Sequence, residues 1–281
     1  MEICRNIADI RRVIATFRAG GATMGLVPTM GALHAGHIAL VTAAKDKCDR
    51  VVATIFVNPT QFGQTEDLEK YPRTEEADLA VLKAAGVDAV FIPTADDIYP
   101  DGDETIVETT HLANVLHGAV RPGHFRGVTT VVARLFNICQ PTHAFFGEKD
   151  YQQLQVLRRM VTDLHFPITI VGVPTVREAD GLAMSSRNLR LTPKNRVAAV
   201  VLNNALNAAQ SAAQDGRMVE DIADLIRQAI DAEPRANLQR LDITHAKTLE
   251  PASGPIAEKI AIMISADFGG ILLIDQREID P

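Results

Sequence analysis

Apolar positions in the first part of the chain alternate between a helical pattern and a strand pattern. Apolar residues recur every three to four positions in segments predicted to be helical, at 7–18, 75–85, 128–139 and 152–165. Short apolar runs rich in β-branched residues predict buried strands, at 22–27, 51–57, 88–92, 144–146 and 168–173. Alternating strands and helices predict an α/β fold, a parallel sheet with helices on both faces.

The pattern changes beyond about residue 175. Helical periodicity covers 193–214 and 220–232, and three short strands are then predicted at 241–244, 260–264 and 271–274. Helices followed by a run of strands predict a smaller α+β domain. We therefore expect two domains, 1–175 and 176–281.

Composition and charge limit the class of protein. The chain has 281 residues, of which 47% are hydrophobic and 22% charged, as in an ordinary soluble globular protein. The apolar runs are far shorter than the ~18 residues of a membrane span, and the start lacks the apolar region of a signal peptide, so a cytoplasmic location is expected. The three cysteines lack CxxC spacing, which favours neither a zinc site nor a disulfide framework. A net charge of −7 argues against nucleic-acid binding, so positive charge for a phosphate ligand must be local.

The segment 28–37 contains the most informative motif, His34-Ala35-Gly36-His37. It lies between an apolar run and an amphipathic run, where a strand leads through a turn into a helix. Such a turn is expected to offer backbone N–H groups and a positive dipole end to an anion, with the two imidazoles as further donors. Gly31 and Gly36 allow a ligand to approach the backbone closely. The alternative is two surface histidines near a turn.

Two more polar segments follow predicted strands, so three motifs share the carboxyl end of the sheet, where ligands of such folds bind. Asn58 and Gln61 end one strand, and a carboxamide binds a hydroxyl or carboxylate as donor and acceptor. Another strand is followed by Gly147, Lys149 and Asp150. Gly147 permits close approach of a ligand to the backbone, and Lys149 offers a mobile positive charge. Asp150 can cap the following helix or bind a ribose. A plain Asn-Pro turn and a solvated helix start are the respective alternatives.

Two further segments carry basic residues beside glycine or serine. Ser185, Ser186 and Arg187 form a compact set of anion-binding groups, although a serine-rich turn before the helix start at Thr192-Pro193 explains them equally simply. The Gly-rich basic loop 121–128 suits a structural or dimer-contact role at least as well as ligand contact. The histidines at 111, 117, 143, 165 and 245 lack ligand-like spacing and are interpreted as structural.

Taken together, these motifs resemble the pantoate–β-alanine ligase family over residues 7–274. They occur in the family's order, as VPTMGALHAGH, IFVNPTQF, YPRT, RPGHFRGV, FGEKDYQQ and DGLAMSSRN. The HAGH and MSSR segments alone would indicate only the wider HIGH/KMSKS nucleotidylyltransferase superfamily, which includes class I aminoacyl-tRNA synthetases. The sequence departs from the family pattern at Ala35, where an acidic residue is frequent, and at Leu189-Arg190.

The resemblance implies a Rossmann-like catalytic domain, a smaller C-terminal lid domain and a homodimer. It implies ATP, pantoate and β-alanine as substrates. The chemistry leads us to expect Mg²⁺ bound through the ATP phosphates with few protein ligands, and the sequence contains no metal-ligand cluster. In the implied reaction, pantoate attacks the α-phosphorus of ATP, and the amine of β-alanine then attacks the pantoyl adenylate. The products are diphosphate, pantothenate and AMP.

The resemblance also implies roles for individual residues. The implied catalytic residues are His34, His37, Lys149, Ser185, Ser186 and Arg187. ATP binding is implied for Met30, Gly31, Ala32, Leu33, His34, Ala35, Gly36, His37, Gly147, Glu148, Lys149, Asp150, Val176, Met184, Ser185, Ser186 and Arg187. Gln61 and Gln153 are implied to bind pantoate, and Gln61 also β-alanine. Asn58 and Tyr71 are weaker candidates for the pantoate pocket, and Asp78 and Glu148 for outer-shell partners of Mg²⁺.

Two other functions stay open at this point. Another adenylyltransferase of the HxGH group would keep HAGH and MSSR but would not need VNPTQF or EKDYQQ. A catalytically silent nucleotide-binding regulator is expected to have lost a phosphate-facing residue, whereas His37, Lys149 and Arg187 are all present. A class I tRNA synthetase fits poorly with the acidic balance of the chain.

Overall fold

The chain divides by its internal contacts into two compact units. The computed structural model describes residues 1–62, 68–69 and 71–281. Unit 1 comprises Met1–Gly147 with Gln152–Val173, and unit 2 comprises Glu148–Tyr151 with Pro174–Pro281. The catalytic and lid roles of domains 1–175 and 176–281 stay predictions.

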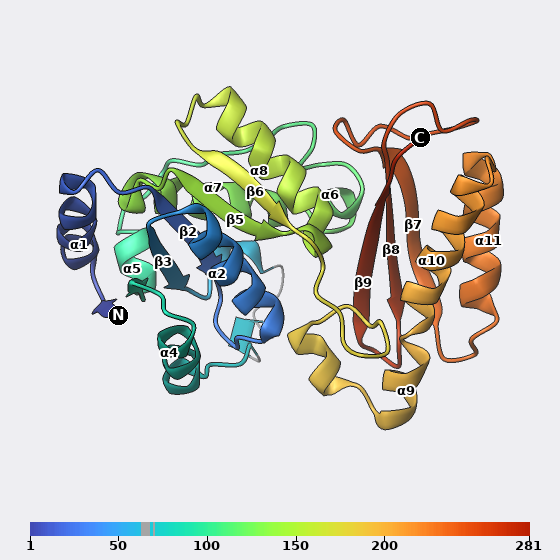
Figure 1. The fold of residues 1–281 in the computed structure, drawn as a ribbon, viewed down its shortest axis with the longest axis horizontal. Coiled ribbons are helices and arrows are strands. Elements are labelled where there is room, and N and C mark those ends of the chain that lie inside the picture. Colours follow the sequence, from blue (N-terminus) through green and yellow to red (C-terminus); the bar gives the residue numbers. More distant parts are fainter. Residues whose placement is uncertain (63–67, 70) are drawn as a thin grey trace. The chain divides into compact units, whose positions relative to one another are not determined.

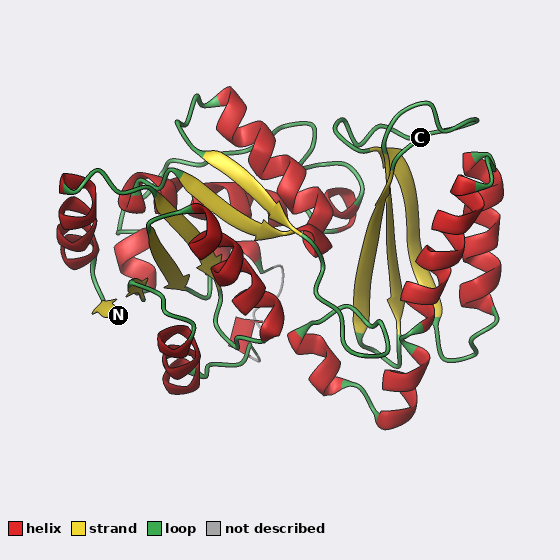
Figure 2. Ribbon diagram, viewed as in Figure 1, coloured by secondary structure: helices red, strands yellow, loops and turns green. Residues whose placement is uncertain are grey.

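Unit 1 is built on a six-stranded parallel sheet, which confirms the predicted α/β class (Figures 1 and 2). Its strands are β1 (Glu2–Cys4), β2 (Met24–Thr29), β3 (Arg50–Ile55), β4 (Ala89–Phe91), β5 (His143–Gly147) and β6 (Thr169–Val173). Their order in the sheet is β1-β4-β3-β2-β5-β6. β3, β2 and β5 are therefore neighbours, and the segments that leave their carboxyl ends start from one edge of the sheet.

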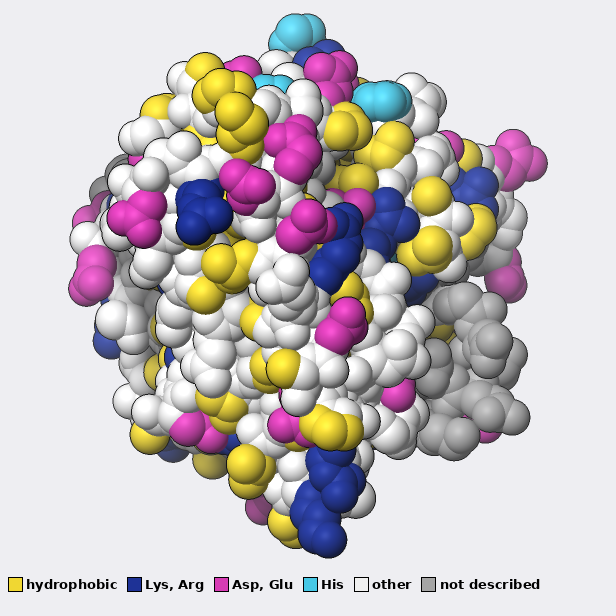
Figure 3. Space-filling view, turned by 90° about the vertical axis from the view of Figure 1, so that its right-hand side faces the viewer, with side chains coloured by type: hydrophobic (Ala, Val, Ile, Leu, Met, Phe, Trp, Pro, Cys, Tyr) yellow, Lys and Arg dark blue, Asp and Glu magenta, His cyan; other side chains and the backbone are white. Residues whose placement is uncertain are grey.

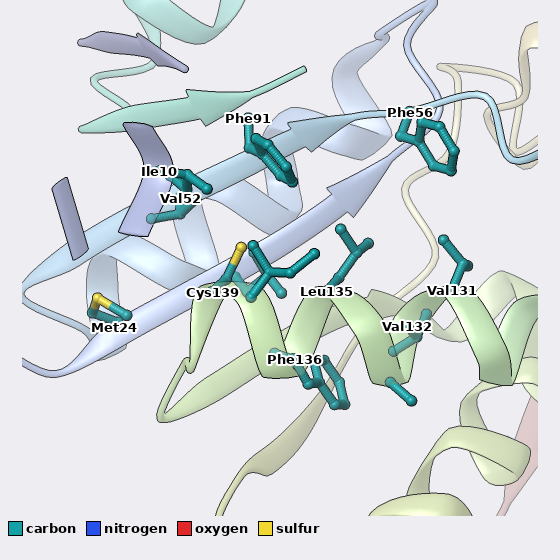
Figure 4. Close-up of a cluster of buried hydrophobic side chains, with 14 of the residues drawn as sticks. Ile10, Met24, Val52, Phe56, Phe91, Val131, Val132, Leu135, Phe136 and Cys139 are labelled. Carbon is teal, nitrogen blue, oxygen red and sulfur yellow. The ribbon is translucent and has the colours of Figure 1, made fainter. Parts of the chain in front are cut away.

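Helices cover both faces of this sheet because side chains alternate along each strand. The helices are α1 (Ile7–Ala19), α2 (Ala35–Lys47), α4 (Glu75–Ala84), α5 (Ala95–Ile98), α6 (His117–Val120), α7 (His124–Cys139) and α8 (Tyr151–Asp163). On β2, Leu26 packs in the cluster that includes α1, α7 and α8, whereas Val27 packs in the cluster that includes α2 and α4. Figure 4 shows the first cluster, with Leu135 of α7 beneath the strands.

Unit 2 holds a three-stranded antiparallel sheet with helices on one face. The strands are β7 (Asn237–His245), β8 (Ile260–Asp267) and β9 (Leu272–Ile279), in that order, and the helices are α9 (Pro193–Ala198), α10 (Val201–Gln214) and α11 (Val219–Asp231). Isoleucines of α11 and β8 meet apolar residues of α10 in one buried cluster. On the face drawn in Figure 3, basic, acidic and apolar side chains are interspersed. The described part of the chain has no helix with the length and apolarity needed to cross a bilayer.

Several boundaries differ from the sequence-based expectation. The predicted helix 193–214 is two helices, because the chain turns at Ala199 and Val200 with tighter bonds such as Val200 N–H to the Val197 carbonyl. α7 begins at His124 rather than 128, since Gly123 adopts a left-handed φ of 81° there. The three-residue edge strand β1 and the four-residue helices α5 and α6 were not predicted, because segments so short carry little periodicity.

Candidate active site

The turn that follows β2 carries the first motif, and the turn that follows β3 carries the second. Three residues of the second turn form a 3-10 helix, η1 (Pro59–Gln61). The two turns touch: Nε2 of Gln61 lies 3.1 Å from the sulfur of Met30. The prediction that polar segments after different strands converge at one sheet edge is therefore confirmed for these two.

His34 and His37 cap the start of α2 reciprocally. Nδ1 of His34 accepts from the Gly36 N–H at 3.1 Å, and Nδ1 of His37 accepts from the His34 N–H at 3.2 Å. The two ring centroids are 4.2 Å apart. Because each Nδ1 is an acceptor, each neutral ring carries its proton on Nε2. The pair therefore has fixed ring positions and two Nε2–H donors.

The backbone N–H groups of this turn are already hydrogen-bonded, which corrects the expectation that they are offered to an anion. Acceptors within the protein are found for the N–H groups of Gly31, Ala32, Leu33, His34, Gly36 and His37. The expected arrangement of strand, turn and helix start is present, but these donors are used to build the turn. The prediction of an anion site at this motif therefore depends on side chains, above all on the two imidazoles.

The buried carboxylate of Asp78 holds the turn from α4. Its Oδ1 accepts from the Leu33 N–H at 2.8 Å, and its Oδ2 accepts from the Ala32 N–H at 3.0 Å and from the Thr74 hydroxyl at 3.1 Å. Ala32 and Gly31 have φ values of 51° and 81°, so the backbone is in the left-handed region where the carboxylate binds the turn. Asp78 is only 3% exposed. These bonds give Asp78 a structural role that spacing along the sequence did not indicate.

Asn58 and Gln61 form a hydrogen-bonded pair of carboxamides. Nδ2 of Asn58 donates to Oε1 of Gln61 at 3.0 Å and to the Gly127 carbonyl at 3.2 Å. Oδ1 of Asn58 accepts from the backbone N–H and the hydroxyl of Thr60. The Asn58 side chain is 1% exposed, so its bonds are shielded from water.

The backbone fixes which way both amides point. A backbone N–H only donates and a carbonyl only accepts, so Oδ1 of Asn58 must face Thr60 and Nδ2 must face Gly127. Nδ2 then donates to Gln61, which commits Oε1 of Gln61 as an acceptor. The remaining end of Gln61 is its amide Nε2, which has two N–H donors. One of them has the Met30 sulfur as its acceptor, and the other suits an oxygen of a carboxylate or hydroxyl.

The backbone of Gln61 is held by the start of α7. Its carbonyl lies 2.9 Å from Nδ1 of His124. A Cβ at Gly127 would lie 2.5 Å from the Thr60 carbonyl oxygen, so only glycine lets η1 approach the helix this closely. This gives the Gly-rich basic loop 121–128 a structural role, one of the two interpretations of that segment.

The adjacent glutamines of α8 have different surroundings. Gln152 is 3% exposed and bonds only to backbone, accepting from the His117 N–H and donating to the carbonyls of Leu112 and Val115. Gln153 is half-buried, and its side chain makes no hydrogen bond to the described residues, which leaves its carboxamide available to a ligand. The second of the two is the one that the family resemblance implicated.

The segment after β5 forms η2 (Glu148–Asp150), which groups with unit 2. The Tyr151 hydroxyl lies 2.9 Å from the Ala246 carbonyl and 2.6 Å from Oε1 of Glu278 at the end of β9. Lys149 is half-buried and Asp150 is exposed. Tyr151 therefore anchors the predicted phosphate- and ribose-binding residues to the sheet of unit 2.

The serine-rich segment lies elsewhere along the same sheet. Ser185 caps η3 (Ser186–Arg190) by accepting from the Arg187 N–H at 3.2 Å, and Arg187 donates to the Leu272 carbonyl at 3.1 Å. Leu272 and Glu278 are the first and seventh residues of β9, about 20 Å apart at the rise of an extended strand. The structure thus holds these two predicted anion-binding segments at opposite ends of β9. The carbonyl of Val176 accepts from the Met184 N–H at 2.9 Å.

Arg196 of α9 ties together the hairpin that precedes Ser185. It donates to Oε2 of Glu178 at 2.6 Å and to both carboxylate oxygens of Asp180, at 2.8 and 3.0 Å. Asn188, just after Arg187, donates to the other oxygen of Glu178. Hydrogen bonds from Arg196 lower the pKa of both Glu178 and Asp180 below their ordinary values. These contacts fix the backbone on both sides of the serines.

Sequence reasoning missed two residues that support the predicted ones. Tyr99 and Arg196 act through contacts with residues distant in the sequence. Tyr71, a weaker candidate, packs edge-on against Phe62 with ring centroids 5.8 Å apart. Within the described ranges, no three His, Cys, Asp or Glu residues are grouped as a metal site would require.

Comparison with known proteins identifies the family. The family model described as pantoate-beta-alanine ligase matches residues 2–278. The chain is 48% identical to the pantothenate synthetase of Bartonella quintana over 277 residues, covering 98% of this chain and 97% of that one. It is 48% identical to that of Moorella thermoacetica over 279 residues, with 98% and 97% coverage.

Solved structures give the same result. The crystal structure of pantothenate synthetase from Thermus thermophilus is 46% identical, with a TM-score of 0.94 and complete coverage of both chains. The ligase from Francisella tularensis, solved in complex with beta-gamma ATP and beta-alanine, is 34% identical, with a TM-score of 0.80 and coverage of 99% and 97%. This chain belongs to the pantoate–β-alanine ligase family.

Proposed function

We propose that this member of the family joins pantoate to β-alanine at the expense of ATP, through a pantoyl adenylate. The carboxylate of pantoate attacks the α-phosphorus and diphosphate leaves. The amine of β-alanine then attacks the acyl carbon, forming the amide bond of pantothenate and releasing AMP. The observation that carries this proposal is the Gln61 carboxamide, whose oxygen is held by Asn58 and whose Nε2 contacts Met30 in the turn that leads to the paired His34 and His37. The membership of the chain in the pantoate-beta-alanine ligase family supports it.

The first step needs positioning and charge stabilisation rather than a base. A carboxylic acid with a pKa near ~4 is already ionised at neutral pH, so pantoate is a ready nucleophile. The barrier comes from bringing an anion to a triphosphate and from charge that develops on the phosphoryl oxygens. We assign the Nε2–H groups of His34 and His37 as donors to those oxygens, His37 foremost, because their rings are held by backbone bonds.

We assign further ATP contacts to other residues of the sequence motifs. Lys149 and Arg187 supply positive charge toward phosphates, Ser185 and Ser186 supply hydroxyls, and Asp150 binds the ribose. Met184 and the backbone of Val176 lie along the nucleotide, as do residues 30–37 and Gly147–Glu148 in the same assignment. Mg²⁺ enters with ATP, bound mainly by phosphate oxygens as this ion prefers.

Gln61 and Gln153 receive pantoate in this proposal. Gln61 Nε2 donates to an oxygen of the acid, because Oε1 is committed to Asn58. β-Alanine also carries a carboxylate, so the same Nε2 suits it in the second step. Gln153 binds pantoate with both ends of its carboxamide, since neither end is hydrogen-bonded to a described residue.

An isotope experiment tests the proposed reaction. Pantoate labelled with ¹⁸O in its carboxylate is incubated with ATP, Mg²⁺ and β-alanine, and the products are examined by mass spectrometry. Attack on the α-phosphorus transfers one labelled oxygen to AMP. Label in orthophosphate, or the formation of ADP, would instead indicate an acyl phosphate and would contradict the adenylate route.

Assembly and location complete the proposal. The family resemblance supports a homodimer, which light scattering coupled to size-exclusion chromatography measures directly. A cytoplasmic location fits three cysteines that are buried and unoxidised.

A further inference from the structure

Tyr99 ends the hydrogen-bond chain that starts at Gln61. Its hydroxyl donates to Oδ1 of Asn58 at 2.7 Å, the shortest of the bonds that reach this atom. The same hydroxyl lies 3.1 Å from the Thr60 hydroxyl, which in turn lies 3.0 Å from Oδ1 of Asn58. Three donors therefore converge on Oδ1 of Asn58: the Tyr99 hydroxyl, the Thr60 hydroxyl and the Thr60 N–H.

The Tyr99 side chain is itself held in place. The guanidinium carbon of Arg134 lies 4.6 Å from the centre of the Tyr99 ring. That guanidinium donates to the Ile98 carbonyl at 2.6 Å and to the Asp103 carboxylate at 2.7 Å. Burial raises the pKa of Tyr99 above its ordinary value, so the hydroxyl stays protonated and donates. The hydroxyl that donates to Asn58 therefore belongs to a side chain that these contacts hold in place.

The consequence for Gln61 follows from the order of the contacts. Oδ1 of Asn58 is fixed by Tyr99 and Thr60, and this fixes Nδ2 at the other end of the same planar amide. Nδ2 donates to Oε1 of Gln61, so the amide nitrogen Nε2 of Gln61 is directed away from Asn58. Loss of the Tyr99 hydroxyl would leave Oδ1 with the Thr60 donors alone, and the amide could tilt.

We propose that Tyr99 is a positioning residue for substrate binding: through Asn58, its hydroxyl sets the orientation in which Gln61 presents Nε2 to a carboxylic acid. This inference rests on the proposed role of Gln61. Tyr99 does not itself contact the substrate. Its effect is expected on the acid substrate bound by Gln61 and not on ATP.

The variant Tyr99→Phe tests this by deleting one oxygen atom. We expect the Kd for pantoate, measured by calorimetry, to rise about 2- to 10-fold, as for one lost neutral hydrogen bond, while the KM for ATP is unchanged. The control is Thr142→Val, which deletes a hydroxyl bonded to the Met24 backbone at the amino end of the same sheet. This control should change neither constant. Equal shifts in Tyr99→Phe and Thr142→Val would overturn the proposal.

A double-mutant cycle shows whether Tyr99 acts through Gln61. In a Gln61→Ala background, Tyr99→Phe should have no further effect on the Kd for pantoate. Effects that multiply in the double variant would overturn the positioning role and leave the assignment of Gln61 standing. A pantoate Kd unchanged by Gln61→Ala alone would overturn that assignment, and this inference with it.

Thermal unfolding separates positioning from a general loss of structure. Tyr99→Phe should keep a cooperative transition like that of Thr142→Val. If Tyr99→Phe does not fold, Thr60→Val is the second test, because it removes the other hydroxyl that donates to Oδ1 of Asn58. It should also raise the Kd for pantoate. A folded Thr60→Val with wild-type affinity would then overturn the proposal.

Discussion

Nδ1 of His37 lies 3.2 Å from the backbone nitrogen of His34, so the second histidine of the motif caps the residue that carries the first. Helix N-caps are usually Ser, Thr, Asp or Asn, whereas here a histidine occupies the N-cap position of α2. In each ring, Nδ1 accepts a hydrogen bond from a backbone N–H, and Nε2 carries the proton. The spacing of three residues in HAGH is thus explained by the first turn of α2.

Replacement of His37 should affect chemistry far more than stability. His37→Ala removes one held donor, which should lower the rate of adenylate formation by about 10²–10³, as for other donors to developing oxyanions. Loss of its capping bond should cost about 1 kcal/mol of unfolding free energy. Diphosphate release under single-turnover conditions measures the first effect. His111→Ala, at an exposed histidine, is the control, and wild-type rates in His37→Ala would remove His37 from the chemistry.

Asp78→Asn should loosen the turn that carries the histidines. Asparagine has one acceptor oxygen, so either the Ala32 or the Leu33 N–H loses its partner, and a buried unsatisfied donor costs about 1–3 kcal/mol. Urea unfolding should show that loss, together with a raised KM for ATP. The control Asp9→Asn changes a half-buried carboxylate that accepts from the side chains of Asn6 and Arg12, and it should shift the unfolding free energy by less than about 0.5 kcal/mol. Equal stability of the two variants would refute the role given to Asp78.

Gly127→Ala should displace η1 from α7. The added methyl would meet the Thr60 carbonyl oxygen at 2.5 Å and the Gln61 nitrogen at 2.8 Å, and overpacking of this kind costs about 1–3 kcal/mol. Because the displaced residues include Gln61, the KM for pantoate should rise more than that for ATP. Gly20→Ala is the matched control, since its Cβ would have ordinary contacts at 3.5 Å and its φ is −83°. Parallel changes in both KM values would argue against this mechanism.

Arg196 should make stability depend on pH in the acid range. The pKa values of Glu178 and Asp180 are lowered in the folded state by hydrogen bonds from Arg196, so their stabilisation is present above the ordinary values of 4.5 and 3.8 and is lost as the pH falls below them. In Arg196→Met, the unfolding free energy should therefore fall less steeply as the pH drops below 4.5. Arg227→Met, which breaks an exposed ion pair with Asp224, should keep the wild-type slope. If Arg196→Met kept the wild-type slope, the hydrogen bonds of Arg196 would not control the titration of Glu178 and Asp180.

The sequence predicted what depends on local periodicity. Strand β2, with apolar residues from Met24 to Val27, and helix α2 both follow from patterns within one segment, and so does the turn between them. The three motifs after β2, β3 and β5 indicated one sheet edge because parallel strands end together. Two of these motifs do meet, at Met30 and Gln61.

What could not be predicted depends on contacts between distant residues. The N–H groups of Ala32 and Leu33 look available in the sequence, and only the fold brings Asp78 from α4 to bond them. The same holds for Tyr99, which reaches Asn58 from the end of a four-residue helix with no pattern of its own. The grouping of Glu148–Tyr151 with unit 2 also follows from such a contact, between Tyr151 and Glu278.

The most direct test of the proposed function measures diphosphate release in the presence of ATP and Mg²⁺. With pantoate alone, we expect a burst of about one equivalent per active site, because the bound adenylate has no acceptor. Addition of β-alanine should convert the burst into continuous turnover with equal amounts of AMP and pantothenate. Continuous release without β-alanine, or no release with both acids present, would contradict the two-step ligase.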